Sequence, residues 1–291
     1  MAGGRLLLVV NPHASRAAHA LGAAVSALFA EGFALDIRQC AGPDEVHDLI
    51  LRESAGVDAI VIGGGDGTVS GTLPALIEVG LPVGILPLGT ANDLARTLGI
   101  PVNPSEAARI IAAGSRRKID IGLVNDIHFL NVSSIGLAVE VTDRLDPELK
   151  RTLGPLSYAA AAIQTLGDAE RFQAVIACNG ERTDVTTYQV TVGNGVRYGG
   201  GARVSTEAAI DDGILDIFAI ETASIPELVA MAPAFFEGRH GGRDDVKVFR
   251  CTEATIETIE PMPISTDGEI TTETPARYSV MRQALEVFAP R

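Results

Sequence analysis

The sequence predicts an α/β domain followed by a β-rich domain, and three observations support this division. The first hundred residues alternate short apolar strands with segments of helical spacing. After about Gly114 the pattern changes to β-type segments separated by turn pairs. The chain has 291 residues, of which 46% are hydrophobic, so it is long enough and apolar enough to bury two sizeable cores.

Four apolar strands define the first domain. We expect them at Arg5–Val10, Ala34–Gln39, Asp58–Ile62 and Val83–Leu86. Between them, Ala17–Ala30 has helical spacing, and Pro43 opens a second helix, because proline is favoured in a first turn. Apolar strands that alternate with helices form a parallel sheet covered on both faces. Ligands of such sheets bind at the carboxyl ends of the strands, where two glycine-bearing loops are expected.

A series of β-type segments defines the second domain. They are Lys118–Val124, Ile127–Val132, Phe172–Ala177, Val185–Val192, Ile214–Ile220, Lys247–Cys251 and Ala254–Ile259. Turn pairs such as Asn179-Gly180 separate them, and helical segments are expected at Gly154–Gly167 and Ser224–Phe236. This succession predicts a largely antiparallel β domain. The cleft between the two domains is the expected place for the functional site.

The charge of the chain excludes one class of function. Acidic residues outnumber basic ones by 37 to 23, the net charge is −14, and there is no tryptophan. Nucleic-acid binding depends on an excess of Lys and Arg and, for single strands, on aromatic side chains. We therefore expect no nucleic-acid partner. Since the same charge repels phosphates, phosphate chemistry in this protein would require a divalent metal.

The cysteines and the hydropathy favour a cytoplasmic protein, and the histidines do not predict a zinc site. Cys40, Cys178 and Cys251 are odd in number and form no C-x-x-C pair, which is typical of reduced thiols. The five histidines lack the spacing of a zinc site. No segment is long and apolar enough to span a bilayer, and the N-terminal apolar run is too short for a secretory signal.

The most informative motif follows the third strand and consists of Gly63, Gly64, Gly65, Asp66, Gly67 and Thr68. Adjacent glycines let the backbone approach a phosphate chain, because no Cβ blocks the approach, and their N–H groups can bind its oxygens. Thr68 and the helix expected after it add a hydroxyl and a positive helix end. Asp66 would repel a phosphate unless it binds Mg²⁺ or a Mg-bound water. The motif thus predicts a metal-assisted phosphate site; the alternative is a glycine-rich turn without a ligand.

A second loop, Pro87–Arg96, ends the next strand and contains Gly89, Thr90, Asn92 and Asp93. Taken alone, helix capping through Asn92 and Asp93 is the simpler interpretation. The position of this loop beside the first one favours a role in the same phosphate site.

With these motifs in this order, the sequence resembles the diacylglycerol kinase catalytic-domain superfamily, which includes sphingosine kinases, ceramide kinases and the small bacterial lipid kinases. The resemblance covers nearly the whole chain, and the total length is similar to that of the bacterial stand-alone enzymes. The matching segments are Asn11-Pro12, Gly64–Thr68, Gly89–Arg96, Asn131–Gly136, Gly199–Gly201, Asp211–Asp216 and Asp267–Glu269.

The resemblance implies a Rossmann-like nucleotide-binding domain at residues 1–120 and 277–291. It also implies a C-terminal antiparallel β-sandwich domain at residues 121–276 that receives the lipid, as in NAD kinase and diacylglycerol kinase folds. ATP would be held by Asn11, by the Gly63–Thr68 loop and by Gly89, Thr90, Asn92 and Asp93 of the second loop, with Asp66 serving the catalytic Mg²⁺. Glu269 would be the general base that accepts the proton of the lipid hydroxyl, and Asp267 would orient it.

Two of these assignments have a simpler structural alternative. Asp267-Gly268 is also the sequence of an ordinary hairpin turn, after which Glu269 would merely be solvated. The resemblance implies a structural Mg²⁺ ligand at Asp212, whereas Asp211-Asp212-Gly213 by itself predicts only a turn into the strand that follows.

The function that the resemblance implies is transfer of the γ-phosphoryl group of ATP to a hydroxyl of a lipid such as diacylglycerol. The substrate would be met from the cytoplasm at the inner membrane face. An NAD kinase-like small-molecule kinase and a catalytically silent lipid-binding or regulatory module of the same fold are the alternatives. The second glycine loop and the late Asp-Gly-Glu favour a lipid kinase over an NAD kinase-like enzyme. The presence of both Asp66 and Glu269 favours a catalyst over a silent binding module. The sequence does not identify the lipid, and it leaves a homodimer open.

Overall fold

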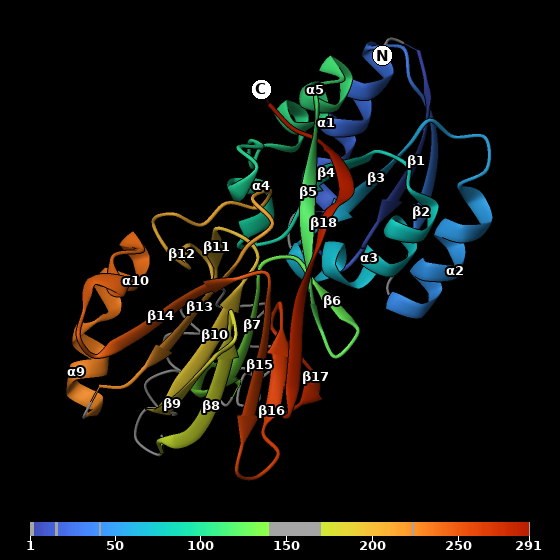
Figure 1. Cartoon of the computed structure of the whole chain (residues 1–291). Helices are drawn as coiled ribbons and strands as arrows, with labels where there is room; N and C mark the ends of the chain where they lie inside the picture. The colour runs from blue at the N-terminus through green and yellow to red at the C-terminus, as the bar shows by residue number, and fades with distance from the viewer. Residues whose placement is uncertain (1–2, 15–16, 41, 140–169, 223, 291) are drawn as a thin grey trace. The chain divides into compact units, whose positions relative to one another are not determined.

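The computed structural model describes residues 3–14, 17–40, 42–139, 170–222 and 224–290 (Figure 1). The chain divides into two compact units. The first contains Met1–Ile119 and Gln283–Arg291, and the second contains Asp120–Arg282. Strand β5 (Arg116–Val124) leads the chain from the first unit into the second, and β18 (Ala276–Phe288) leads it back. By this division the chain re-enters the first unit at Gln283.

The first unit is a parallel sheet with helices between its strands. Its strands are β1 (Arg5–Val10), β2 (Ala34–Gln39), β3 (Ala59–Gly64) and β4 (Val83–Pro87), and its helices are α1 (Ala17–Ala30), α2 (Pro43–Glu53), α3 (Asp66–Val79), α4 (Asp93–Thr97) and α5 (Pro104–Ala113). The order β2-β1-β3-β4 is parallel throughout, and the end of β18 joins beyond β4, with Val287 paired to Val83. Helix α1 packs against α5, and α2 packs against α3.

The burial of the strands explains this arrangement. Every residue of β3 and β4 is buried, and so is every residue of β1 after Arg5, as expected for strands with helices on both faces. Edge strand β2 is largely exposed. In the β1–β3 pair Val10 lies opposite Gly63, so the residues that follow the two strands lie close together at the carboxyl end of the sheet.

The second unit is a β-sandwich. Its strands besides parts of β5 and β18 are β6 (Ile127–Phe129), β7 (Val132–Gly136), β8 (Phe172–Cys178), β9 (Glu181–Thr187), β10 (Gln189–Gly193), β11 (Arg197–Tyr198), β12 (Ala202–Arg203), β13 (Leu215–Ile220), β14 (Val246–Cys251), β15 (Glu253–Thr258), β16 (Pro263–Thr266) and β17 (Glu269–Glu273). Helices α9 (Ile225–Ala230) and α10 (Ala232–Glu237) and the 3₁₀ turn η1 (His240–Gly242) follow β13.

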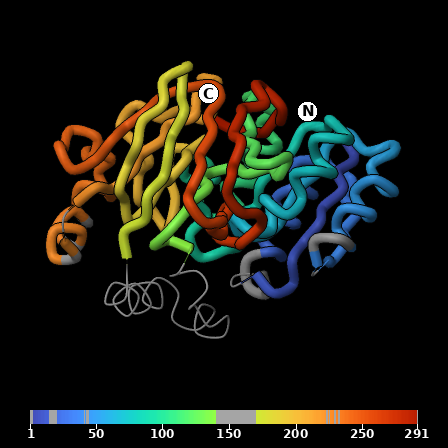
Figure 2. The backbone as a smooth tube through the Cα atoms, turned by 60° about the horizontal axis from the view of Figure 1, so that its bottom comes forward, coloured from blue at the N-terminus to red at the C-terminus, as the bar shows by residue number. Residues whose placement is uncertain are grey.

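Two antiparallel layers enclose the core of this unit. One layer has the order β14-β13-β10-β7-β16-β17, and the other contains β9-β8-β15-β18, with the β8–β9 hairpin visible as the yellow pair of traces in Figure 2. Buried side chains of both layers form one hydrophobic cluster, among them Ile135, Val190 and Ile217 from the first layer and Ile176 and Ile256 from the second. The antiparallel second domain that the sequence predicted is confirmed by these two packed layers.

Three predicted elements are divided differently in the structure. The segment Val185–Val192 forms the end of β9 and most of β10, because the chain changes layers at Tyr188, whose N–H donates to Ile220 O of β13. The segment Ile127–Val132 is likewise split between β6 and β7, and Ser224–Phe236 forms two short helices, α9 and α10. The helix expected at Gly154–Gly167 lies outside the described residues.

Candidate active site

Three loops of the first unit meet at the carboxyl ends of β1, β3 and β4. The N–H of Asn11, directly after β1, donates to Gly63 O at 2.9 Å, and its side-chain Nδ2 donates to Thr68 Oγ1 at 3.0 Å. The N–H of Leu88, after β4, donates to Gly64 O at 2.9 Å. These hydrogen bonds bring the three predicted nucleotide-binding segments of this unit together.

The closest approach is between the two glycine loops. A Cβ on Gly89 would lie 2.4 Å from the Cα of Gly65, and a Cβ on Gly65 would lie 3.1 Å from the Cα of Gly89. Backbone atoms cannot move aside as a flexible side chain can, so Gly89 requires glycine, and a side chain at Gly65 would be tightly crowded. The glycines are therefore needed for packing of loop on loop, in addition to any contact with a phosphate.

Asn92 holds the second loop in shape. Its Oδ1 accepts from Gly89 N at 3.0 Å and its Nδ2 donates to Gly89 O at 2.8 Å, so one side chain satisfies both backbone groups of that glycine. Asn92 is buried and has a left-handed backbone with φ of 52°, which asparagine tolerates well. It stands at the N-cap of α4 without a side-chain cap hydrogen bond, so its role differs from the capping considered above. Asp93 is the buried first residue of that helix.

Asp66 connects the two loops. It is the first residue of α3, and its Oδ1 accepts a hydrogen bond of 3.0 Å from the backbone N–H of Leu94. Its Oδ2 has no hydrogen bond to any residue that the structure describes. Gly67 and Thr90, on the two neighbouring loops, are exposed. One oxygen of Asp66 thus orders the site and the other is available to a ligand from solvent.

This donor set fits the metal that the sequence predicts at Asp66. Mg²⁺ in kinases is held by one or two carboxylates together with substrate phosphates and waters, and it needs no complete protein cage. Within the described ranges, no group of three or more His, Cys, Asp or Glu side chains is arranged to hold a metal. A single carboxylate oxygen beside a glycine cradle is therefore compatible only with a metal that arrives with its phosphates.

In the second unit, Asp267 fixes a loop with its carboxylate. The turn Asp267-Gly268 joins β16 to β17 with φ values of 49° and 91°, the geometry of a tight hairpin. Asp267 Oδ2 accepts from Leu130 N at 2.7 Å, and Oδ1 accepts from Asn131 N at 2.8 Å and from Val132 N at 3.2 Å. The hairpin predicted as the alternative is present, and its first residue in addition ties β17 to the start of β7.

Glu269 begins β17 directly after this turn. Its side chain is exposed, and it forms no hydrogen bond or ion pair with a described residue. A solvated carboxylate on a turn that is held by three backbone hydrogen bonds is suited to accept a proton from a bound substrate. The two candidate carboxylates, Asp66 and Glu269, are thus contributed by different units.

Sequence reasoning missed Asn194, which organises the same part of the second unit. Its Nδ2 donates to Asp120 O at 3.0 Å and to Leu130 O at 2.8 Å, and its N–H donates to Asn131 O at 3.0 Å. It is buried, as is Asn131. The signal that could have revealed it is an asparagine between two glycines, Gly193 and Gly195, at the end of a buried strand.

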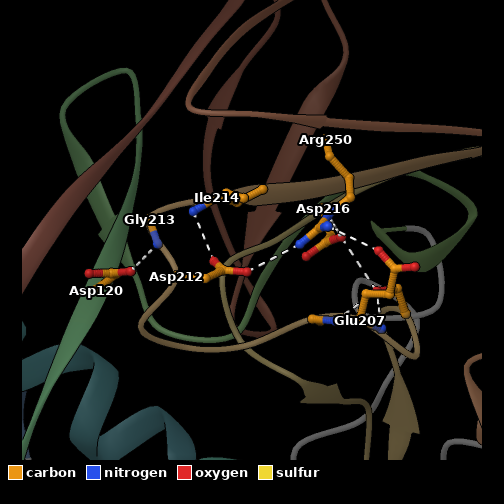
Figure 3. A network of polar contacts seen from close by, with 9 residues as sticks. Asp120, Glu207, Asp212, Gly213, Ile214, Asp216 and Arg250 are labelled. Carbon is orange, nitrogen blue, oxygen red and sulfur yellow. Dashed lines mark hydrogen bonds and ion pairs between the residues drawn. The ribbon is translucent and has the colours of Figure 1, made fainter.

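Asp212 lies in a network around Arg250 (Figure 3). Its Oδ1 accepts from Ile214 N at 3.0 Å, and its Oδ2 lies 3.2 Å from Arg250 Nη2. Arg250 also forms an ion pair with Glu207 at 3.0 Å. Its Nε lies 2.9 Å from Asp216 Oδ1, but the angle at the N–H does not allow a hydrogen bond. Burial raises the pKa of both Asp212 and Asp216, and Arg250 opposes this shift. The guanidinium of Arg250 thus supplies positive charge at the turn where the sequence predicts a metal. The metal at Asp212 stays a prediction.

No helix in the described part of the chain combines the length and hydropathy required to cross a membrane.

Comparison with known proteins agrees with the division of the chain into an α/β unit and a β-sandwich unit. Residues 5–124 match the model of the diacylglycerol kinase catalytic domain, and residues 131–289 match the YegS C-terminal NAD kinase beta sandwich-like domain. The chain is 31% identical to a diacylglycerol kinase of Mycobacterium tuberculosis, with 85% of this chain and 82% of that protein covered. It is 30% identical to a probable lipid kinase YegS-like of Chromohalobacter salexigens, with 86% and 81% covered.

Two further comparisons extend these. An uncharacterized protein of Synechocystis is 32% identical over 85% of this chain, and the chain spans only 60% of its length. The solved structure of a diacylglycerol kinase from Bacillus anthracis has a TM-score of 0.76 at 25% identity and covers 99% of this chain and 97% of its own. The α/β unit with its glycine loops and the β-sandwich unit define a kinase of the lipid-kinase class. The chain belongs to the diacylglycerol kinase catalytic-domain family.

Proposed function

We propose that the protein transfers the γ-phosphoryl group of ATP to a hydroxyl group of a lipid alcohol such as diacylglycerol, with Mg²⁺ as its metal. The observation that supports this most directly is the hydrogen bond between Asp66 and Leu94, which holds a carboxylate beside two glycine loops while leaving one of its oxygens unbonded. The names of the relatives favour the same reaction class.

The glycine loops bind the phosphates in this proposal. The backbone N–H groups after β3 and the N-terminus of α3 attract phosphate oxygens, and the hydroxyls of Thr68 and Thr90 lie on the same loops. Asn11 holds the Thr68 hydroxyl in place from the neighbouring strand. Mg²⁺, when bound with the nucleotide, would be held by Asp66 Oδ2 and would offset the negative charge of the phosphates.

Glu269 acts as the base in this proposal. Its carboxylate accepts the proton of the substrate hydroxyl as that oxygen forms its bond to the γ-phosphorus and the bond to the β-phosphate oxygen breaks. Asp267 holds the turn that presents Glu269 through its three backbone hydrogen bonds. The net reaction consumes ATP and the alcohol and yields ADP, the phosphate monoester and one proton.

The test is turnover by the purified protein with Mg²⁺ and ATP against a panel of acceptors. The panel contains diacylglycerol, a sphingoid base and phosphatidylglycerol in mixed micelles, with NAD as the soluble acceptor. We expect phosphorylation of at least one lipid alcohol and none of NAD. Turnover with NAD alone would instead identify a small-molecule kinase, and no turnover with any acceptor, in a protein that still binds lipid, would identify a binding module.

A further inference from the structure

The β11–β12 hairpin of the second unit has one packed face and one charged face. On the packed face, the rings of Tyr198 and Phe218 lie 6.4 Å apart between centroids, and Ala202 and Val204 are buried. Since successive side chains of a strand alternate between faces, Arg197 and Arg203 lie on the opposite face.

The two arginines are direct cross-strand neighbours. Strands β11 and β12 pair antiparallel with Arg197 opposite Arg203. The Cβ atoms of such a pair are about 4.5–5.5 Å apart, and like charges at this distance destabilise the hairpin. The arrangement therefore calls for an opposite charge on this face.

No carboxylate in the described ranges supplies that charge. Arg197 Nη1 donates to Gly201 O at 3.3 Å, and Arg203 Nε is buried without an acceptor. The chain is acidic, and many of its other arginines do pair with carboxylates: Arg5, Arg38, Arg116, Arg182, Arg239, Arg243 and Arg250. The chain has 37 acidic residues, so two adjacent arginines that have no carboxylate among the described residues favour an anion that comes from outside the chain.

The turn between the strands leaves room for such an anion. Gly199, Gly200 and Gly201 have φ values of 59°, 87° and 128°, which side chains disfavour. A Cβ at any of these three positions would meet no atom of a described residue within 4 Å. These glycines therefore serve the tight turn, and the space beside them is open.

The donors select the chemistry of the ligand. A guanidinium is planar and presents its N–H groups as a rigid fork that matches the oxygens of a phosphate. Two such forks on cross-strand neighbours suit an anion with several oxygens and more than one negative charge. A phosphate monoester or a polyphosphate meets both conditions, whereas a halide meets neither.

We propose that Arg197 and Arg203 form a binding site for a phosphate group. The site is independent of the transfer reaction proposed above, because the two guanidinium groups define it without Asp66 or Glu269.

The direct test is a titration of the ¹⁵N-arginine-labelled protein with inorganic phosphate, followed through the arginine Nε–H signals. Arg197→Gln and Arg203→Gln assign the two signals. We expect saturable shifts of both in the wild-type protein, and at least about tenfold weaker binding at the Arg197 signal in Arg203→Gln, since a hydrogen bond to a charged group is lost. Arg182→Gln removes an exposed arginine of the same unit and is the matched control, for which wild-type shifts are expected.

Two results would overturn the proposal. Shifts that grow linearly with phosphate would mark an adventitious ion only. Equal saturable shifts in Arg203→Gln would place the bound phosphate elsewhere. Arg203→Lys is a second variant in case Arg203→Gln misfolds, because lysine keeps the positive charge but lacks the planar guanidinium. Circular dichroism checks that it is folded. Its phosphate affinity should lie between those of the wild-type protein and Arg203→Gln.

Two assays identify the source of the phosphate group. A raised KM for ATP in Arg203→Gln assigns the site to the nucleotide. Weaker co-sedimentation with vesicles that contain phosphatidic acid, whose headgroup is a phosphate monoester, at unchanged binding to phosphatidylcholine vesicles, assigns it to a lipid headgroup. Wild-type results in both assays assign it to free phosphate. Since the titration needs no turnover, its failure leaves the proposed function intact, and a failure of the kinase assay leaves the titration valid.

Discussion

The carboxylate of Asp66 and the backbone N–H of Leu94 form a hydrogen bond of 3.0 Å that joins two loops 28 residues apart. The same carboxylate thus has a structural task through Oδ1 and a proposed metal-binding task through Oδ2. The two tasks can be separated by substitution.

Asp66→Asn keeps an oxygen that can accept from Leu94 and removes the negative charge. We expect a thermal stability close to that of the wild-type protein and a loss of Mg²⁺-dependent turnover on the order of 10²-fold or more, since metal stabilisation of a transition state is worth several kcal/mol. Asp66→Ala also loses the loop contact and should be less stable by about 1.5–3 kcal/mol. Melting curves and turnover against Mg²⁺ concentration measure both; an Asp66→Asn protein with wild-type Mg²⁺ dependence would refute the metal role.

Glu269→Gln removes the proposed base and keeps a side chain of nearly the same size and shape. Turnover should fall by about 10²–10⁴-fold, the range of general acid–base catalysis, while ATP binding and the melting temperature stay near their wild-type values. Glu273→Gln, an exposed carboxylate on the same strand, is the control and should retain activity. Equal activity of Glu269→Gln and Glu273→Gln would rule out the base.

Asp267→Ala should act through stability first. The substitution leaves three backbone N–H groups of residues 130–132 without their acceptor. We expect a loss of about 2–4 kcal/mol in the free energy of unfolding, because hydrogen bonds to a charged group contribute about 1.5–3 kcal/mol each and are not additive. Urea unfolding measures it. A stability loss no larger than that of Glu269→Gln would show that Asp267 does not hold this loop.

Arg250→Gln tests which cation serves the turn at Asp212. It leaves the buried Asp216 without its counter-ion, and we expect a loss of about 1–3 kcal/mol, below the value for a fully buried pair because Arg250 is 36% exposed. If the guanidinium is the cation at this turn, Mg²⁺ without nucleotide should raise the melting temperature of Arg250→Gln more than that of the wild-type protein, because the variant has lost its own cation.

If instead Mg²⁺ raises the melting temperature of the wild-type protein and Asp212→Asn removes this effect, the result supports the predicted metal at Asp212.

His240 should make stability depend on pH. It is buried between the rings of Phe235 and Phe218, at 4.5 and 4.6 Å, and burial lowers its pKa from 6.5. The unfolded chain therefore binds a proton more readily, so the contribution of His240 is complete above about pH 6.5 and is lost as the pH falls toward the lowered pKa. Melting temperatures between about pH 7.5 and 5.5 should fall less in His240→Phe; the remaining slope is expected from His128, whose pKa burial also lowers. An unchanged slope in His240→Phe would contradict this.

Much of the first unit could be predicted from local pattern. Continuous apolar runs such as Arg5–Val10 and the helical spacing of Ala17–Ala30 gave the observed bounds, because a strand covered on both faces must be apolar throughout. The division at Tyr188 was not predictable, since β-favouring residues such as Thr187 and Val190 continue on both sides of the change of layer. The cross-strand pair Arg197 and Arg203 was missed because its strands have only two residues each.

By itself the sequence determined the order of the elements, the positions of both glycine loops and the candidate carboxylates Asp66 and Glu269. Only the tertiary structure decided which partner each polar group takes. It assigned Asp66 Oδ1 to Leu94, Asp267 to the loop 137 residues before it, and Asp212 to Arg250. The physical reason is range: apolar periodicity is a property of neighbouring residues, whereas a hydrogen bond acts over about 3 Å and depends on where distant segments meet.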